Sequence, residues 1–297
     1  MKNIGVIVNT DRDRELKYTG ILASNLCEAG ANVILMSEIA EKLNIDSSCI
    51  RKKSKKSEIL KDADVLICLG GDGTFLKAAR SVYKKNIPIL GINLGSLGFL
   101  TEVEKNEIKD AVNCLMTGKY IVEERMMLEA TIIRNDEIIG KDTALNDIVI
   151  SRGALSRILH VKTYINDVFV DMFPGDGLIV SSPTGSTAYS LAVGGPIVEP
   201  DIDLIIVSPI CPHILYSRSF ITASDRKVKA VIDEEYAHKA MVTVDGQKGY
   251  EIRGGDVIEV QKSTHTIKLI RINPKNFYNI LRSKIYFRGE SLRKNEV

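Results

Sequence analysis

The segment Val65-Leu66-Ile67-Cys68-Leu69-Gly70-Gly71-Asp72-Gly73-Thr74-Phe75 decides the fold of the first part of the chain. It begins with a continuous apolar run at 65–69, passes through glycines that flank one aspartate, and continues into residues 75–85, whose spacing is helical. A short apolar run without alternation is typical of a strand buried on both faces of a parallel sheet. The segment therefore predicts a buried strand, a tight loop and a helix.

The same pattern surrounds this segment. Residues 16–29 have helical spacing and stop at Gly30, a residue that tolerates positive φ at the end of a helix. Strands alternating with helices indicate a parallel sheet covered by helices. The basic run at 51–56 could meet phosphates, and we expect a solvated loop there instead. Further buried strands are predicted at 4–8, 33–36 and 87–92.

The pattern changes after Glu124, where apolar and polar residues alternate with a period of two. Such alternation indicates antiparallel β structure. Asn135-Asp136 and Asn166-Asp167 each separate two such runs and are typical of hairpin turns. Further strands are predicted at 228–232, 241–244, 257–260 and 267–272.

Two domains follow from this change of pattern. We predict an α/β domain at 1–123 and a mostly antiparallel, all-β domain at 124–274. The tail at 275–297 contains a short amphipathic segment, 277–281, and we expect it to pack back on the first domain.

Composition excludes several classes of protein. Of 297 residues, 44% are apolar and 26% charged, the proportions of a folded globular protein. A net charge of +2 disfavours a nucleic-acid coat or a membrane-surface protein. No apolar run approaches the roughly 20 residues that span a bilayer, and no signal peptide is evident. The five cysteines are odd in number and scattered, so we expect no disulfide framework and a reduced, cytosolic protein.

Several familiar motifs are missing. There is no P-loop, no Gly-x-Gly-x-x-Gly after the first strand and no Gly-x-Ser-x-Gly. The four histidines lack metal-ligand spacing. These absences disfavour a P-loop nucleotide site, a dehydrogenase and an α/β hydrolase.

The loop at 70–74 carries the first chemical signal. Its glycines let backbone N–H groups approach phosphate oxygens, and the following helix adds its positive N-terminal end. An acidic residue in an anion-binding loop indicates a chemical role, since Asp72 could hold Mg²⁺ between phosphates or accept a proton from an attacking hydroxyl. A tight turn in which Asp72 caps the helix remains the alternative.

Other segments add polar groups. Residues 91–100 follow the next strand and should lie beside the glycine loop. Residues 175–190 crowd hydroxyls and a glycine together, which suits a ribose, an amide or a phosphate. The side chains at 144–147 suit a base edge and a ribose diol, whereas 244–247 would be an ordinary turn if seen alone.

In this order, and over nearly the whole chain, these segments resemble the NAD kinase family. Gly-Gly-Asp-Gly-Thr is weakly specific, since lipid kinases also carry it, but Pro-Thr-Gly-Ser-Thr-Ala-Tyr at 183–189 behind Asp-Gly-Leu at 176–178 is specific. The resemblance implies that ATP or polyphosphate phosphorylates the 2′-hydroxyl of the adenosine ribose of NAD, giving NADP, with Mg²⁺ held mainly by the donor phosphates. It also implies a Rossmann-like first domain, a β-sandwich-like second domain, and a homodimer or homotetramer. Composition, as argued above, predicts a cytoplasmic protein without nucleic-acid or membrane partners.

The resemblance also implies roles for single residues, with neighbouring subunits completing the site. Asp72 would be the proton acceptor, with Gly73 beside it. Asn146 and Asp147 would bind the ribose and base of NAD, and Asp176 the nicotinamide side. The other residues implied in the nucleotide site are Lys77, Arg157, Thr187, Ala188, Tyr189, Ser190, Ala192 and Gln247.

Two positions depart from the family pattern. Pro174 stands where many relatives carry a basic residue, and Ser182 replaces a threonine while keeping its hydroxyl. Two rival functions also remain open: a lipid kinase that uses the same glycine loop, and a non-catalytic NAD(P)-binding regulator. The first would need a membrane-docking surface, and no basic amphipathic helix is evident.

Overall fold

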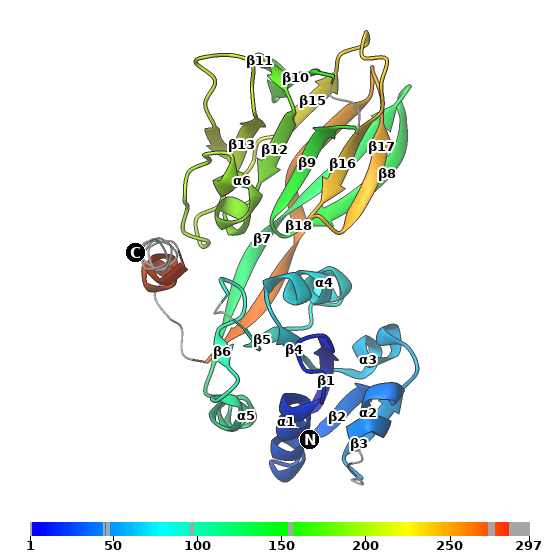
Figure 1. The fold of residues 1–297 in the computed structure, drawn as a ribbon, viewed down its shortest axis with the longest axis vertical. Coiled ribbons are helices and arrows are strands. Elements are labelled where there is room, and N and C mark those ends of the chain that lie inside the picture. The colour runs from blue at the N-terminus through cyan, green and yellow to red at the C-terminus, as the bar shows by residue number, and fades with distance from the viewer. Residues whose placement is uncertain are drawn as a thin grey trace, which may run out of the picture. The chain divides into compact units, whose positions relative to one another are not determined.

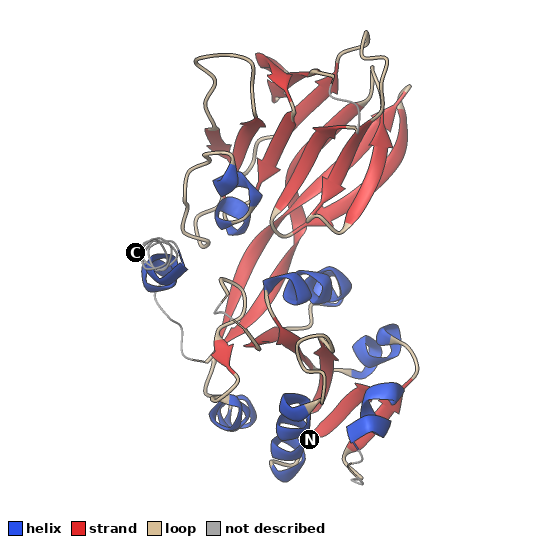
Figure 2. Cartoon of the chain, viewed as in Figure 1, coloured by secondary structure: helices blue, strands red, loops and turns tan. Residues whose placement is uncertain are grey.

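The computed structural model describes residues 2–43, 45, 48–95, 98–153, 157–272 and 277–284 (Figure 1). The chain divides into two compact units, Met1–Glu123 with Lys268–Val297 and Glu124–Ile267. Two long strands, β7 (Ile121–Arg134) and β18 (Val257–Arg271), have residues in both units. Helices gather around the strands of the first unit, whereas the second consists almost entirely of strands (Figure 2). The predicted fold class, α/β followed by antiparallel β, is confirmed.

The first unit is built on a parallel sheet in the order β5-β4-β1-β2-β3. Its strands are β1 (Asn3–Val8), β2 (Asn32–Met36), β3 (Ile50–Lys53), β4 (Val65–Gly70) and β5 (Ile89–Asn93), with β6 (Val103–Glu104) beside β5. Its helices are α1 (Lys17–Glu28), α2 (Ser37–Leu43), α3 (Lys56–Asp62), α4 (Asp72–Val82), the 3-10 helix η1 (Tyr83–Lys85) and α5 (Ile108–Thr117).

Alternate residues of the central strand β1 face different helices. Ile4 and Val6 are buried in one apolar cluster with side chains of α1 and α5, which lie side by side (Figure 1). Gly5 faces α3, because a Cβ there would lie only 2.9 Å from Ile59 Cγ2. The sheet is thus covered on both faces, which explains why its strands lack polar alternation.

Some details differ from the predictions. The basic run is not simply a loop: Arg51, Lys52 and Lys53 belong to β3, which pairs only with β2 in the described chain. Charged side chains are tolerated there because edge strands stay open to water. Helix α4 begins at Asp72 rather than at 75, and the runs 257–260 and 267–272 are parts of one strand, β18.

The cysteine prediction also needs correction. A disulfide joins Cys27, near the end of α1, to Cys49, which precedes β3. The pairing could not be predicted from the sequence, because only the packing of α1 against the sheet brings the two positions together. Cys68, Cys114 and Cys211 are free thiols.

The second unit consists of two antiparallel sheets. One contains β11 (Val168–Gly175), β10 (Leu159–Ile165), β15 (Val228–Ile232), β18, β7 and β8 (Glu137–Ala144). The other has the order β14 (Phe220–Ala223), β13 (Leu204–Ile210), β12 (Gly177–Ser181), β9 (Asp147–Arg152), β16 (Ala240–Val244), β17 (Lys248–Ile252). The inward side chains of both sheets form one apolar core. The 3-10 helix η2 (Thr184–Thr187) and the short α6 (Tyr189–Ala192) follow β12.

The two predicted hairpin turns are confirmed. Asn135 and Asp136 have φ of 49° and 64°, and Asn166 and Asp167 have φ of 46° and 63°. Positive φ at both central residues is the geometry of a type I′ turn, which matches the right-handed twist of strands. In the described part of the chain, no helix is both long and apolar enough to cross a membrane.

We expect an ion pair with a buried carboxylate to stabilise the second unit. Asp256 is 1% exposed, and its carboxylate accepts hydrogen bonds from Arg134 Nε at 2.9 Å and Nη2 at 2.7 Å. The variant Arg134→Met should lower the free energy of unfolding by about 3 kcal/mol, because it leaves a buried charge without its partner. Urea unfolding followed by circular dichroism would measure this.

The matched control for this prediction is Lys141→Met. Lys141 pairs with Glu129 at 3.0 Å on the surface, where its own side chain is 56% exposed. Its loss should change the free energy of unfolding by less than about 1 kcal/mol. Equal effects of the two substitutions would contradict the argument from burial.

Candidate functional site

In the first unit, three loops meet at one edge of the parallel sheet. They follow β1, β4 and β5, which are neighbours and run in the same direction, so their carboxyl ends coincide. In open α/β sheets this edge is where ligands bind. Gly70 ends β4, and a Cβ on it would lie 2.5 Å from Thr74 Oγ1, so the tight turn into α4 requires glycine.

Asp72 occupies the first turn of α4 and is held by the loop after β5. Its Oδ2 accepts the Phe99 N–H at 2.9 Å, and its Oδ1 accepts the Leu100 N–H at 3.2 Å. Both N and Oγ1 of Thr101 lie 3.3 Å from the same Oδ1. The prediction that the segment 91–100 lies beside the glycine loop is confirmed for its described part; positions 96 and 97 are outside the described residues. The carboxylate is therefore fixed in position.

The peptides that hold Asp72 are themselves held from the other side by Arg271. This buried residue near the end of β18 donates from Nη1 to Leu100 O at 3.3 Å and from Nη2 to Phe99 O at 3.5 Å. Its Nε donates to Glu123 Oε2 at 2.6 Å. Sequence analysis missed Arg271, since nothing in the apolar run around it indicates which backbone it meets.

A lysine of the last described helix, residues 277–284, reaches the same carboxylate. Lys284 Nζ lies 3.8 Å from Asp72 Oδ2 and 5.0 Å from the centre of the Phe99 ring. The Phe277 ring, at 6.0 Å, also contacts Phe99. A cation from the end of the chain thus faces Asp72.

In the second unit, a second aspartate organises the loop between β8 and β9. Asp245 accepts the N–H groups of Leu145 at 3.0 Å, Asn146 at 2.8 Å and Asp147 at 3.3 Å. Asp245 and Gly246 have φ of 51° and 60°, a type I′ turn between β16 and β17. A segment that reads as an ordinary turn therefore carries the carboxylate that shapes the loop at 145–147.

The two polar side chains of that loop are unusual. Asp147 is only 5% exposed, and burial, followed by the charge of Asp245, raises its pKa to about 7. The Oδ1 of Asn146 is buried and has no hydrogen-bond partner in the described part of the chain. A buried polar atom without a partner costs free energy unless a ligand satisfies it. The loop therefore carries one amide oxygen without a partner among the described residues and one buried carboxyl group.

The serine side chains of the hydroxyl-rich segment make hydrogen bonds within the protein. Ser182 Oγ donates to Leu145 O at 2.5 Å, and Ser181 Oγ donates to Asn146 O at 3.2 Å. The hydroxyls of Ser190 and Ser208 lie 3.3 Å apart. The first two contacts fix the loop at 145–147, so the departure at Ser182 keeps a structural hydroxyl. The buried Thr184 Oγ1 has no partner among the described residues.

The other residues implied by the resemblance lie at the surface or near it. Gly73 and Lys77 are exposed on α4, and a Cβ on Gly73 would meet nothing within 4 Å. Thr187 and Ala188 are half-buried. Of the implied residues, those exposed in the second unit are Tyr189 and Ala192 of α6 and Gln247 of the turn after β16.

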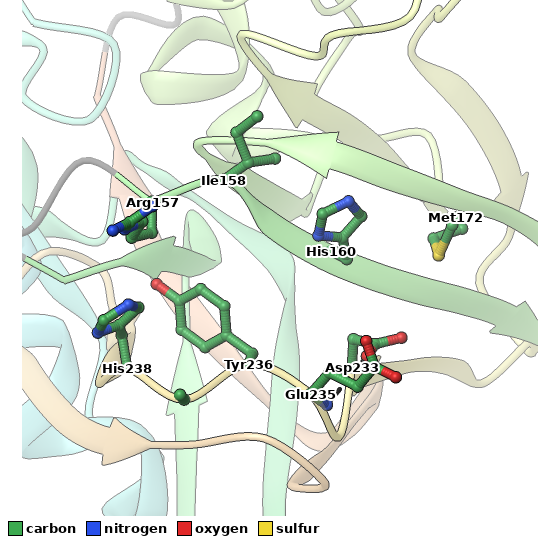
Figure 3. A pocket seen from close by; sticks show the side chains of 9 residues that line it. Arg157, Ile158, His160, Met172, Asp233, Glu235, Tyr236 and His238 are labelled. Atoms are coloured by element: carbon green, nitrogen blue, oxygen red, sulfur yellow. Dashed lines mark hydrogen bonds between the residues drawn. The ribbon is translucent and has the colours of Figure 1, made fainter.

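Arg157 belongs to a cavity of about 670 Å³ in the second unit (Figure 3). Figure 3 shows the Tyr236 hydroxyl pointing toward Arg157, with His238 nearby. That hydroxyl is buried, and burial raises the pKa of Tyr236. The other residues of the lining are Ile158, His160, Met172, Asp233, Glu235 and Ala237. Sequence analysis missed this cavity, apart from Arg157.

Asp176 is paired outside that cavity. Arg152 Nε donates to Asp176 Oδ1 at 2.6 Å, which fixes the carboxylate at the end of β11. Pro174 lies on the same strand, and its carbonyl accepts the His213 N–H at 2.8 Å. Across the described residues, no cluster of three or more His, Cys, Asp or Glu side chains could hold a metal ion.

Both units match known families of sequence. Residues 4–120 match the ATP-NAD kinase N-terminal domain, and residues 145–272 match the ATP-NAD kinase C-terminal domain. An NAD kinase of Acetivibrio thermocellus is 58% identical, covering 99% of this chain and 100% of the relative. An NAD kinase of Ruminiclostridium cellulolyticum is 51% identical, covering 98% of this chain and 100% of the relative.

Solved structures agree. The structure of yeast NADH kinase complexed with NADH has a TM-score of 0.88 at 25% identity, covering 97% of this chain and 88% of that one. An NAD kinase from Archaeoglobus fulgidus in complex with ATP has a TM-score of 0.74 at 24% identity, covering 95% and 99%, a likeness of fold. With both domains matched in order and relatives this similar over nearly the full length, the chain belongs to the NAD kinase family.

Proposed function

We propose that the Asp72 loop receives the phosphate donor and that the loop at 145–147 binds NAD, in the phosphorylation of NAD by ATP that defines this family. As a family member the chain is a phosphotransferase. One observation carries the assignment of the reacting group. In the described chain of the first unit, Asp72 is a carboxylate held by peptide N–H groups within a glycine turn at the ligand-binding edge of the sheet.

The acceptor is the 2′-hydroxyl of the adenosine ribose, and the product is NADP. An aspartate carboxylate is a weak base for a ribose hydroxyl, but phosphoryl transfer passes through a loose transition state that needs little proton loss beforehand. Asp72 orients the hydroxyl and takes its proton late in the reaction. Its hydrogen bonds to the loop at 99–101 support this role, because they fix the carboxylate without a contribution from the substrate.

The NAD site draws on unsatisfied groups of the second unit. Asn146 Oδ1 lacks a partner among the described residues, and Asp147 is a buried acid beside it. An amide recognises the edge of a base, and a carboxylate accepts hydrogen bonds from the two hydroxyls of a ribose. The remaining contacts to NAD come from Arg157, Asp176, Gln247 and the segment from Thr187 to Ala192.

The donor is ATP, and inorganic polyphosphate is a second candidate. The neighbour from Archaeoglobus fulgidus was solved with ATP, and the yeast neighbour with NADH, which makes NADH a candidate acceptor. The described residues offer no metal cluster of their own. In the proposed reaction Mg²⁺ is held mainly by the donor phosphates, where it would neutralise their charge.

The chain works as a homo-oligomer, a dimer or a tetramer, in the cytoplasm. The support for assembly is an apolar surface on β11, where Val168, Phe169 and Val170 are 69%, 55% and 41% exposed. Adjacent exposed apolar side chains on an edge strand favour burial against a partner. A neighbouring subunit would complete the NAD site.

The test of the function is NADP formation by the purified chain. NAD or NADH is supplied with ATP or polyphosphate, with and without Mg²⁺, and diacylglycerol is offered in parallel. NADP from NAD and ATP, dependent on Mg²⁺, is the expected result. Phosphorylation of the lipid alone, or binding of NAD without any consumption of a donor, would overturn the proposal.

Asp72→Asn should lower kcat by roughly a hundredfold or more, the scale of a positioned proton acceptor, and change the KM for NAD by only a few-fold. Steady-state kinetics of NADP formation would measure both. Asp110→Asn is the control, because Asp110 is an exposed aspartate in the first turn of another helix, α5. Unchanged turnover in the Asp72 variant would exclude it as the proton acceptor.

Asp147 should make NAD binding depend on pH. Its pKa is raised from 3.8 to about 7, so the carboxylate forms as pH rises through 7, and the KM for NAD should fall about tenfold between pH 6 and pH 8. The free energy of unfolding should change in the opposite direction. The stability that the neutral acid contributes is lost as pH rises toward 7.

Asp147→Asn should remove this pH dependence from the KM for NAD, because asparagine does not titrate. The control is Asp201→Asn, an exposed aspartate of the same unit, which should keep the dependence. A pH profile that survives in the Asp147 variant would assign the titration to another group.

Phe169→Lys should dissociate the oligomer, because it places a charge within the apolar surface of β11. Light scattering coupled to size-exclusion chromatography would report the mass in solution. Ile202→Lys is the control, since Ile202 is similarly exposed, at 47%, but does not belong to β11. A wild-type chain that runs as a monomer would contradict the proposed assembly.

A further inference from the structure

The loop between β1 and α1 borders the glycine turn of the first unit. The Asn9 N–H donates to Leu69 O at 2.9 Å, and Asn9 Nδ2 donates to Thr74 Oγ1 at 3.0 Å. These bonds fix the loop beside the segment that leads from β4 into α4. Arg12 lies three residues beyond Asn9, in the same loop.

The guanidinium of Arg12 lies against both glycine-containing loops. A Cβ built on Gly71 would be 3.0 Å from Arg12 Nη1, and a Cβ built on Gly95 would be 2.7 Å from the same atom. Gly71 precedes α4, and Gly95 follows β5. The absence of side chains at these two positions is what lets the guanidinium approach the backbone of both loops.

This guanidinium has no partner of opposite charge in the described part of the chain. Arg12 is exposed, and its backbone N–H alone makes a hydrogen bond, to Asn9. Of the acids in the same loop, Asp13 accepts hydrogen bonds from Tyr18 and Thr19, and no ion pair joins Arg12 to Asp11 or Glu15 among the described residues. The cation is therefore available to a ligand.

Two other cations near Asp72 already have acidic partners, whereas Lys77 of α4 is exposed. Lys284 lies 3.8 Å from Asp72, and Arg271 donates to Glu123 at 2.6 Å. A guanidinium offers a planar fork of N–H donors that matches two oxygens of one phosphate, and it keeps its charge at any working pH. Phosphate is thus the ligand chemistry that suits Arg12 in this place.

We propose that Arg12 is a binding residue for the phosphate chain of the donor. The inference rests on the proposed function and deepens it, because it assigns to the β1–α1 loop a contact that distinguishes donor from acceptor. Removing the guanidinium should weaken binding of the donor and leave binding of NAD almost unaffected, since the proposed NAD contacts other than Asp72 lie in the second unit.

The test is the variant Arg12→Met, which keeps much of the side-chain length and removes the charge. The KM for ATP should rise between about tenfold and a hundredfold, the range for a lost hydrogen bond to a charged group. The KM for NAD should stay within about twofold, and Arg12→Lys should recover part of the loss because it restores the charge without the fork. Arg14→Met is the matched control: an exposed arginine of the same loop.

A second variant reaches Arg12 without changing it. In Gly95→Ala the new Cβ would meet Nη1 at 2.7 Å and push the guanidinium aside, so the KM for ATP should again rise. Combined with Arg12→Met, this substitution should add little, because the two act on one contact. A readout independent of turnover is calorimetric binding of tripolyphosphate, which should weaken in both single variants and not in Arg14→Met.

The outcomes separate the inference from the function on which it rests. If the wild-type chain forms NADP and Arg12→Met leaves the KM for ATP and tripolyphosphate binding unchanged, Arg12 does not bind the donor and the function stands. A rise in the KM for NAD alone would equally overturn the inference. A wild-type chain that forms no NADP would remove the proposed function itself.

Discussion

The candidate site of the first unit depends on one interaction: backbone hydrogen bonds hold the carboxylate of Asp72 in place. Peptide N–H groups at 99–101 supply that hold, and Arg271 secures the carbonyls of the same peptides from behind. Backbone N–H groups restrict the position of a carboxylate more than long side chains do, because they have less conformational freedom. Lys284 Nζ adds a positive charge 3.8 Å from Oδ2, the oxygen that also accepts the Phe99 N–H.

The second unit uses the same device for a different purpose. Asp245 accepts the backbone N–H groups of Leu145, Asn146 and Asp147 and thereby shapes the loop that carries two polar side chains. The proximity of Asp245 also raises the pKa of Asp147, after the larger effect of burial. One carboxylate thus has two consequences: it positions its neighbour and it makes that neighbour reluctant to ionise.

The roles of the Ser and Thr hydroxyl groups were the hardest to predict from the local sequence. A crowd of serines and threonines at 181–190 suggests ligand donors, yet the hydroxyls of Ser181 and Ser182 bond to the carbonyls of Asn146 and Leu145. These two hydroxyls therefore stabilise the loop at 145–147 and are not themselves assigned to a ligand. Conversely, Asp245 and Arg271 look ordinary in sequence, yet each holds the backbone of a loop in the candidate site. Such roles depend on which peptide lies opposite, and that peptide is about a hundred residues away or more in the chain.

The sequence by itself determined the parallel and antiparallel halves, the two Asn-Asp hairpins, the glycine turn before α4 and the family. Each of these is encoded locally, by a periodicity of apolar residues or by a backbone conformation that few residues adopt. Only the tertiary structure decided the partners of Asp72, the edge position of β3, the Cys27–Cys49 disulfide and the placement of Arg12 over Gly71 and Gly95. The reason is that long-range contacts are set by how packed elements meet, and no short stretch of sequence contains both sides of such a contact.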